Sequence, residues 1–296
     1  MPLSRHLGFL AALSLAAAVW WRPLRNLVHL ALSREDYSYL LLVVGISVAL
    51  LCFERWNLPT QPKFSSSALV VMLASLGAAV WLNRTIRMGI DDARFSFSIL
   101  LLVVFILALF VLAYGWEVAA RMRFPLLLLL LAVPLPSQVV SRLVVALQHA
   151  SADAAYALFR VCHVPVLREG LVFSFSRIEI EVAQECSGIR SSTILLITTL
   201  VLAQLFLRSG VNRALVVLWA VFVGVVKNGF RIFTLSVLGE YVSTSILDGP
   251  LHHHGGPVFF SLGLGLVIAA IWLLRKIEAS RIPTAAASLK PDSLVR

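Results

Sequence analysis

Residues 213–231 read RALVVLWAVFVGVVKNGFR, an apolar run that begins at Arg213 and ends at Lys227, Asn228 and Arg231. A helix rises about 1.5 Å per residue, so the segment between the two arginines is about 27 Å long. The hydrocarbon core of a bilayer is about 30 Å thick. We therefore predict a membrane-crossing helix with Arg213 and Arg231 near opposite surfaces.

Similar apolar runs recur along the 296 residues, of which 59% are hydrophobic and 14% charged. Helices satisfy their own backbone polar groups in lipid, and this composition is typical of polytopic helical membrane proteins. The runs are continuous, whereas a transmembrane barrel needs alternating segments of about ten residues. We expect an all-α polytopic fold with about eight transmembrane helices, near 7–22, 38–53, 66–83, 97–116, 124–136, 189–207, 213–246 and 257–274. The seventh is too long for one straight crossing, so it should emerge from the membrane.

The net charge of +10 comes from Lys and Arg residues that lie mostly in short loops between spans. This placement indicates that the basic residues set the membrane topology and contact anionic membrane lipids, rather than bind nucleic acid. The basic residues Arg275, Lys276 and Arg281 place the C-terminal end in the cytoplasm. On that orientation, the segments 138–186 and 247–256 face outward.

The segment 138–186 differs from the spans. Apolar residues recur at intervals of three and four in 138–160, which predicts an amphipathic helix. Apolar and polar residues alternate through 172–182, and with 164–170 this predicts a small β-hairpin. A hairpin has unpaired edges, so it must lie outside the lipid. We expect one integral membrane domain, 1–280, with 138–186 as an extracytoplasmic insertion and 281–296 as a disordered cytoplasmic tail.

The hairpin leads to QECSGIRSS, residues 184–192, where Cys186 stands in a polar turn before an apolar run. The thiolate is the reacting form of cysteine, and a helix N-terminus or nearby cations lower a thiol's pKa. Cys52 lies within an apolar run and is expected to be a small core residue. A disulfide between Cys162 and Cys186 is an alternative that would leave the thiol inert until it is reduced.

Arg231 falls on the same outer face as Cys186. Ionisable residues inside membrane helices usually face protein or a polar cavity, and Asn228 lies one turn earlier on the same side of the helix. The alternative is that Arg231 extends to lipid phosphates. Lys227 points elsewhere and is interpreted as an interfacial anchor.

The loop LHHHGGP, residues 251–257, carries His252, His253 and His254. Adjacent side chains in a loop diverge and no second ligand cluster is visible, so neither a metal nor another cofactor is expected. One of these histidines suits proton transfer near neutral pH.

Cysteine and histidine together form a nucleophile with its base, and Arg231 is placed to stabilise an oxyanion. The combination indicates thiol-dependent acyl transfer or peptide cleavage at the membrane surface.

Residues near these three are expected to have supporting roles. Ser187 and Gly188 are expected to shape the turn before the helix, with backbone N–H groups that could aid the oxyanion. Arg190 either lowers the thiol pKa or binds lipid phosphate. Glu240 and Asp248 are both candidates for orienting the histidine.

These motifs resemble the exosortase/archaeosortase family of membrane transpeptidases. The resemblance rests on ECSGIR at 185–190, NGFR at 228–231, and His252 followed by Gly256 and Phe260, with DYS at 36–38 before the second span. It covers about residues 35–275. Each motif alone is weak, whereas three in this order on one topology are specific.

The resemblance implies that Cys186 is the nucleophile, Arg231 the transition-state stabiliser and His252 the acid and base. The consecutive histidines leave His253 and His254 as alternatives. Family members act in bacterial or archaeal cell membranes on secreted proteins with a C-terminal sorting signal: a motif such as Pro-Glu-Pro, a membrane helix and basic residues. They cleave near the motif through a thioacyl-enzyme and pass the product to a surface acceptor such as a lipid or glycan.

Two other functions fit the same residues. In a transporter or a protein that handles lipid-linked glycans, Arg231 and Lys227 would bind an anionic substrate and Cys186 would be incidental. A plain cysteine protease would release its product to water.

Overall fold

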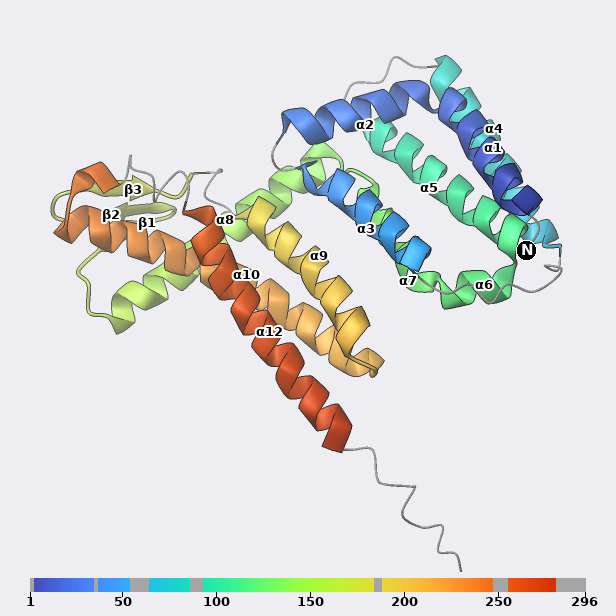
Figure 1. The fold of residues 1–296 in the computed structure, drawn as a ribbon. Helices are drawn as coiled ribbons and strands as arrows, with labels where there is room; N and C mark the ends of the chain where they lie inside the picture. The colour runs from blue at the N-terminus through green and yellow to red at the C-terminus, as the bar shows by residue number, and fades with distance from the viewer. Residues whose placement is uncertain are drawn as a thin grey trace, which may run out of the picture. The chain divides into compact units, whose positions relative to one another are not determined.

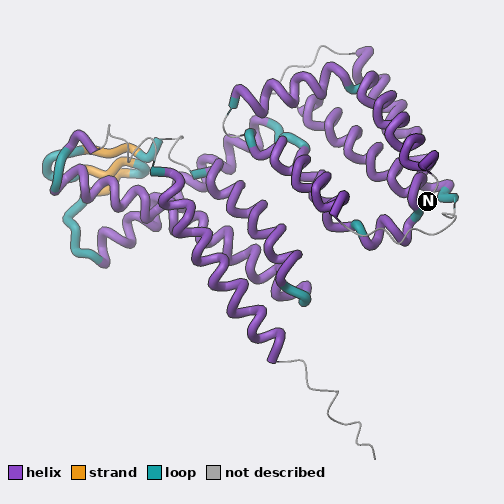
Figure 2. The backbone as a smooth tube through the Cα atoms, in the orientation of Figure 1, coloured by secondary structure: helices purple, strands orange, loops and turns teal. Residues whose placement is uncertain are grey.

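The computed structural model describes residues 3–34, 37–53, 64–85, 93–183, 188–246 and 255–280. These residues are mainly helical, with one small sheet (Figures 1 and 2). The chain divides into two compact units, Met1–Leu143 and Val144–Arg296. Helix α8, Ser137–Val161, begins in the first unit and ends in the second.

The first unit is built of apolar helices around α5. Its elements are α1 Leu3–Val19, α2 Trp21–Ser33, α3 Tyr39–Phe53, α4 Ser66–Thr85, α5 Ala93–Tyr114, α6 Trp116–Arg121, α7 Arg123–Leu128 and the 3₁₀ helix η2 Leu129–Ala132. Trp20 lies at the bend between α1 and α2, fully buried against Phe105 of α5. Its indole Nε1 donates to the Ser98 carbonyl at 2.9 Å, which satisfies the buried polar atom of the ring.

The second unit contains the sheet and the C-terminal helices. Its elements after α8 are β1 Leu167–Glu169, β2 Val172–Ser174, β3 Glu179–Glu181, α9 Ile189–Phe206, α10 Gly210–Tyr241, the 3₁₀ helix η4 Thr244–Ile246 and α12 Gly256–Ser280. The three strands are antiparallel in the order β1-β2-β3. Figure 1 shows α9, α10 and α12 running alongside one another.

Helices α9, α10 and α12 share an apolar core that includes Leu195, Val223 and Val267. At one end of this bundle, Glu278 of α12 accepts hydrogen bonds from the backbone N–H groups of Arg208 and Ser209, both at 2.9 Å. These groups lie where α9 ends and α10 begins, and a helix leaves its first N–H groups without partners. Glu278 therefore fastens the α9–α10 turn to α12.

The other end of α10 extends past the bundle and supports the sheet. Ile232 of α10 joins Phe159 of α8 and Phe173 of β2 in one buried apolar cluster. Glu240, 4% exposed, accepts from the Ser176 hydroxyl at 2.6 Å and from the Arg177 backbone N–H at 3.1 Å. A buried carboxylate needs such donors. The turn between β2 and β3 is thus held on α10.

Helices α8 and α10 cross in close contact at Gly229. A Cβ atom at this position would lie 2.6 Å from the Ala154 Cβ and 3.0 Å from the Ser151 carbonyl oxygen. Only a residue without a side chain allows the two backbones to approach this closely.

Several expectations from the sequence are confirmed. The polytopic all-α fold is observed, the amphipathic stretch 138–160 is α8, and residues 213–241 form part of one continuous helix. The predicted hairpin is present and has a third strand. Of the described helices, α5, α9, α10 and α12 are each long and apolar enough to cross a membrane. Two bent pairs raise the number to six if each is one span: α1–α2 at 83°, and residues 123–132 with α8 at 94°. The total of eight stays a prediction.

One expectation is wrong and others stay untested. Cys52 is exposed rather than part of the core. The buried face of helix α3 is formed by Leu40, Val43 and Ser47, and residue 52 does not lie on this face. The single-domain organisation, the extracytoplasmic position of 138–186 and the orientation remain predictions. The tail, 281–296, lies outside the described residues.

We expect Gly229→Ala to lower the free energy of unfolding by about 1–3 kcal/mol, because the new methyl group has no space against α8. Gly265→Ala in α12 is the matched control: a Cβ there meets nothing within 4 Å. Thermal unfolding of both variants in nanodiscs measures the difference. Equal midpoints would show that the α8–α10 contact is not as close as described.

Candidate functional site around the N-terminal turn of helix α9

The turn that opens α9 is held by a glycine. Gly188 has φ +71°, a left-handed conformation that residues with a Cβ adopt at a cost. A Cβ at this position would also lie 2.7 Å from both Cγ and Oδ1 of Asn228 on α10. The chain therefore enters α9 in direct contact with Asn228.

Asn228 connects three helices. It is 2% exposed, and its Nδ2 donates to the Ser151 hydroxyl of α8 at 3.0 Å. Its other face lies against Gly188. Because a buried amide needs partners to offset its loss of water, Asn228 favours this one arrangement of α8, α9 and α10.

Lys227 is buried between helices rather than placed at the membrane interface. It is 5% exposed, so the prediction of an interfacial anchor is wrong. Its ammonium group donates a hydrogen bond to the Ser191 hydroxyl, which in turn donates to the Gly188 carbonyl oxygen at 3.2 Å. Gly263 of α12 leaves room for the aliphatic part of the Lys227 side chain, since a Cβ at Gly263 would lie 3.1 Å from Lys227 Cδ. This glycine lies 36 positions away in the chain, so no local sequence signal predicts the burial.

The chain that leads to Cys186 is also held by α8. Val182, just after β3, is buried, and its carbonyl oxygen accepts from Gln148 Nε2 at 2.9 Å. Gln148 lies one turn before Ser151 on α8, on the same side of that helix. The described residues on either side of 184–187 are thus held in place, Val182 by Gln148 of α8 and Gly188 by Asn228 of α10.

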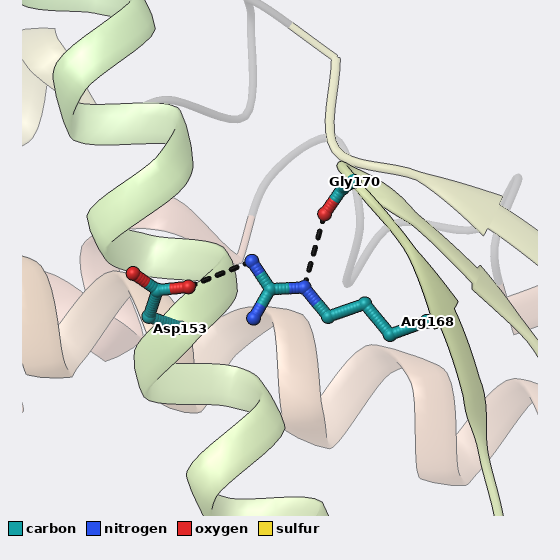
Figure 3. Close-up of polar contacts among 3 residues, drawn as sticks. All are labelled: Asp153, Arg168 and Gly170. Carbon is teal, nitrogen blue, oxygen red and sulfur yellow. Dashed lines mark hydrogen bonds and ion pairs between the residues drawn. The ribbon is translucent and has the colours of Figure 1, made fainter.

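An exposed ion pair fastens the sheet to the same helix. Arg168 of β1 donates from Nη2 to Asp153 Oδ1 at 2.7 Å and from Nε to the Gly170 carbonyl at 3.0 Å (Figure 3). Its guanidinium lies over the rings of Tyr156 and Phe173, 5.5 and 5.6 Å from their centroids. This pair was not predicted, because no sequence motif marks residues 153 and 168.

The start of α12 lies beside the same part of α10. Gly255 is buried, and Phe259 packs edge-to-face on Phe230 with ring centroids 6.1 Å apart. Phe230 directly precedes Arg231, which is half-buried and engaged in interactions of its own. Arg190, in the first turn of α9, is exposed and also engaged.

Five predicted site residues lie outside the described residues: Cys186, Ser187, His252, His253 and His254. The described residues that follow them in the chain come together on α10: Gly188 lies against Asn228, and Phe259 packs on Phe230.

Two further predictions have different outcomes. Both carboxylate oxygens of Glu240 accept hydrogen bonds from the β2–β3 turn, which points to a structural role for this residue. Asp248, the other candidate to orient the histidine, lies outside the described residues. Within the described ranges, no group of three or more His, Cys, Asp or Glu side chains could hold a metal ion. The histidine run falls outside those ranges, so the expected absence of a metal stays a prediction.

Comparison with known protein families gives a match between residues 20–269 and the transmembrane exosortases. The chain belongs to the transmembrane exosortase family. The match includes all three motifs on which the resemblance rests, and it extends from the α1–α2 bend into α12. Membership supports a multi-pass membrane protein with a role in protein sorting. No curated protein and no solved structure matches the chain.

We expect Gly188→Ala to destabilise the protein more than Gly170→Ala. Both glycines have a positive φ, +71° and +63°, but only Gly188 has a side chain against it, because a Cβ at Gly170 meets nothing within 4 Å. The cost at Gly188 should exceed the conformational penalty of about 1–2 kcal/mol. Unfolding midpoints of Gly188→Ala, Asn228→Ala and the double variant should be non-additive, since removing Asn228 makes room for the methyl group. Additive losses would contradict the contact.

Proposed function

We propose that this exosortase-family protein is a membrane-embedded cysteine peptidase and transpeptidase. Its substrates are secreted proteins that end in a sorting signal: a short PEP-CTERM-like motif, a transmembrane helix and a basic tail. It cleaves them at the extracytoplasmic face of a bacterial or archaeal cell membrane, the inner membrane where there are two. The main support is that the first turns of α9 and α12, the helices that follow Cys186 and His252 in the chain, both pack on residues 227–231 of α10.

The reaction begins with the thiolate of Cys186. It attacks the carbonyl carbon of the scissile peptide bond, and the oxygen of that carbonyl gains negative charge. Arg231 stabilises this oxyanion, with help from the backbone N–H groups of Ser187 and Gly188. His252 gives a proton to the leaving amine, the C–N bond breaks, and the protein remains attached to sulfur as a thioester.

The second half-reaction releases the protein. An amine or hydroxyl group of a surface acceptor, a lipid or a glycan, attacks the thioester, and His252 takes its proton. Sulfur leaves as the thiolate, and the sorted protein is then joined to the acceptor. If water attacks instead, the product has a free carboxylate. His253 and His254 are the alternatives for this acid and base.

The supporting residues act on the position of the thiol. Gly188 lets the chain turn into α9 in contact with Asn228, and the proposed role of Ser187 is to help shape this turn. Fixed reacting groups need less reorganisation, which is a major part of catalysis. Arg190, at the exposed first turn of α9, adds positive charge beside the thiol or contacts lipid phosphate.

The burial of Lys227 weighs against a transporter. A transporter that used Lys227 and Arg231 for an anionic substrate would need the ammonium group exposed to that substrate. In the structure this group is hydrogen-bonded to Ser191 between helices, and the side chain is 5% exposed.

We expect Cys186→Ala to abolish cleavage of a tagged secreted protein that carries the sorting signal, a loss of at least about a hundredfold. Arg231→Ala and one of His252→Ala, His253→Ala or His254→Ala should do the same. Cys52→Ala and Cys162→Ala are matched controls, since both thiols are free and exposed. Immunoblots of precursor and product measure cleavage in membranes that hold equal amounts of enzyme. Normal cleavage by the Cys186→Ala variant would contradict the proposal. The C-terminus of the product distinguishes the two reactions: it is joined to the acceptor after transfer and is a free carboxylate after hydrolysis.

A further inference from the structure

Helix α2, in the first unit, carries three different strips of side chains along its length. One strip is buried: Leu27, Leu30 and Ala31 join Phe95 and Ile99 of α5 in one apolar cluster. The other two strips are exposed, and the proposed reaction uses neither of them. Their composition indicates what this helix faces.

The first exposed strip, called the apolar strip, consists of Trp21, Val28 and Leu32. These residues are spaced by seven and four positions, so they lie on one side of the helix. They are 65%, 43% and 75% exposed. Single apolar side chains on a surface are ordinary, whereas a continuous apolar strip marks contact with a partner or a membrane.

The second exposed strip, called the basic strip, consists of Arg22, Arg25 and His29, all exposed. Two of them directly follow members of the apolar strip in the chain, so the two strips are adjacent on the helix. Helix α2 contains no Asp or Glu. Within the described ranges of the chain, no carboxylate is paired with these three side chains. The positive charge of the basic strip is therefore directed at groups outside this helix.

Two observations place α2 at the level of a bilayer surface. Its buried strip packs on Phe95 and Leu40, in the first turns of α5 and α3. Helix α5 has 22 residues and is apolar enough to cross a membrane, and its length of about 33 Å matches a bilayer core of about 30 Å, so its first turn lies near a surface. Helix α2 also turns by 83° from α1 and lies across the start of α5 (Figure 1). It therefore runs along the surface when α1 crosses the membrane.

We propose that α2 lies flat in the membrane interface and binds the headgroups of anionic phospholipids. The apolar strip contacts the upper parts of the acyl chains, and Arg22 and Arg25 of the basic strip donate hydrogen bonds to phosphate oxygens. Guanidinium groups suit this role because their planar set of donors matches a phosphate group. The inference concerns the first unit and does not rest on the proposed reaction.

The order of the strips favours lipid over a partner protein. A bilayer presents acyl chains and phosphates side by side at this depth, and α2 presents an apolar strip and a basic strip side by side at the end of a membrane-crossing helix. Tryptophan is also enriched at this boundary, where its ring is partly in hydrocarbon and its N–H group reaches polar atoms. Trp21 stands at the start of the apolar strip, directly before Arg22.

The test is photo-cross-linking from position 32 of the full-length protein in nanodiscs. Leu32→p-benzoylphenylalanine places a photoreactive group on the apolar strip. The nanodiscs contain phosphatidylcholine, with phosphatidylglycerol of the same acyl chains as the minor component, and mass spectrometry of the adducts gives the ratio of the two lipids at this position. We expect phosphatidylglycerol to be enriched about fivefold or more over its ratio in the bilayer, since each basic residue near an anionic surface contributes about 1 kcal/mol.

The double variant Arg22→Gln/Arg25→Gln should return the adducts to the lipid ratio of the bilayer, because both guanidinium groups are removed. Arg121→Gln/Arg123→Gln is the matched control. It also removes two exposed positive charges from the first unit, but from α6 and α7, which follow the other end of α5. The enrichment at position 32 should then be unchanged. Glu35 and Asp36, which follow α2 and lie outside the described residues, are kept in every variant.

A second position controls for general contact with lipid. Leu73→p-benzoylphenylalanine lies in the middle of the apolar helix α4, where Leu73 is 53% exposed, and should give adducts at the ratio of the bilayer. High salt covers the case in which the arginine variants do not accumulate. In about 1 M salt the Debye length is about 3 Å, so the enrichment at position 32 of the parent protein should fall.

Several results would overturn the inference. One is a set of position 32 adducts at the lipid ratio of the bilayer, or no lipid adduct at all. Another is an enrichment that persists in Arg22→Gln/Arg25→Gln or in high salt, or that is lost equally in Arg121→Gln/Arg123→Gln. The same probe in native membranes gives the last one: adducts with a second protein in place of lipid would show that α2 is a protein interface.

Discussion

Three consecutive residues of α10 contact three different helices, and the candidate site depends on this arrangement. Successive side chains of a helix point about 100° apart. Lys227 therefore reaches α9 and α12, Asn228 meets α8 and the turn before α9, and Gly229 lets the α8 backbone approach. Small residues on the partners make this close packing sterically feasible: Gly188, Gly263 and Ala154 are the points of contact.

This packing defines the ends of the segment that carries the thiol. Val182 is held by Gln148, and Gly188 rests on Asn228, which is itself bonded to Ser151. The two α8 residues are one turn apart, so a single helix face supports both ends. The sheet adds to this support because β2 packs on Phe159 of α8, and the turn after it is bonded to α10.

Periodicity predicted more of this fold than of the site. The apolar runs indicate membrane helices, and the spacing in 138–160 predicts α8, because both patterns follow from burial of one helix face. Alternation across 172–182 predicts one strand, whereas the structure has a turn from Phe175 to Ile178 between β2 and β3. A turn of four residues pairs Phe173 with Ile180, so the apolar positions change from odd to even numbers, and the consecutive polar residues Ser176 and Arg177 mark the break in the sequence. Lys227 and the Gln148–Val182 bond escaped prediction for another reason: each depends on a residue at least 34 positions away.

The central claim is that Cys186, Arg231 and the histidine loop meet at one place on α10. The most direct measurement is cross-linking of Cys186, with Cys52 and Cys162 replaced, to a second cysteine introduced at position 231 or 252. A short bis-maleimide should link Cys186 to both positions in native membranes. Phe222→Cys, exposed on the same helix, is the negative control, and an Asp153→Cys/Arg168→Cys pair is the positive control. Mass spectrometry of linked peptides for both positions, with none for residue 222, is the predicted result. Linking of the positive control but of neither position 231 nor 252 would contradict the account.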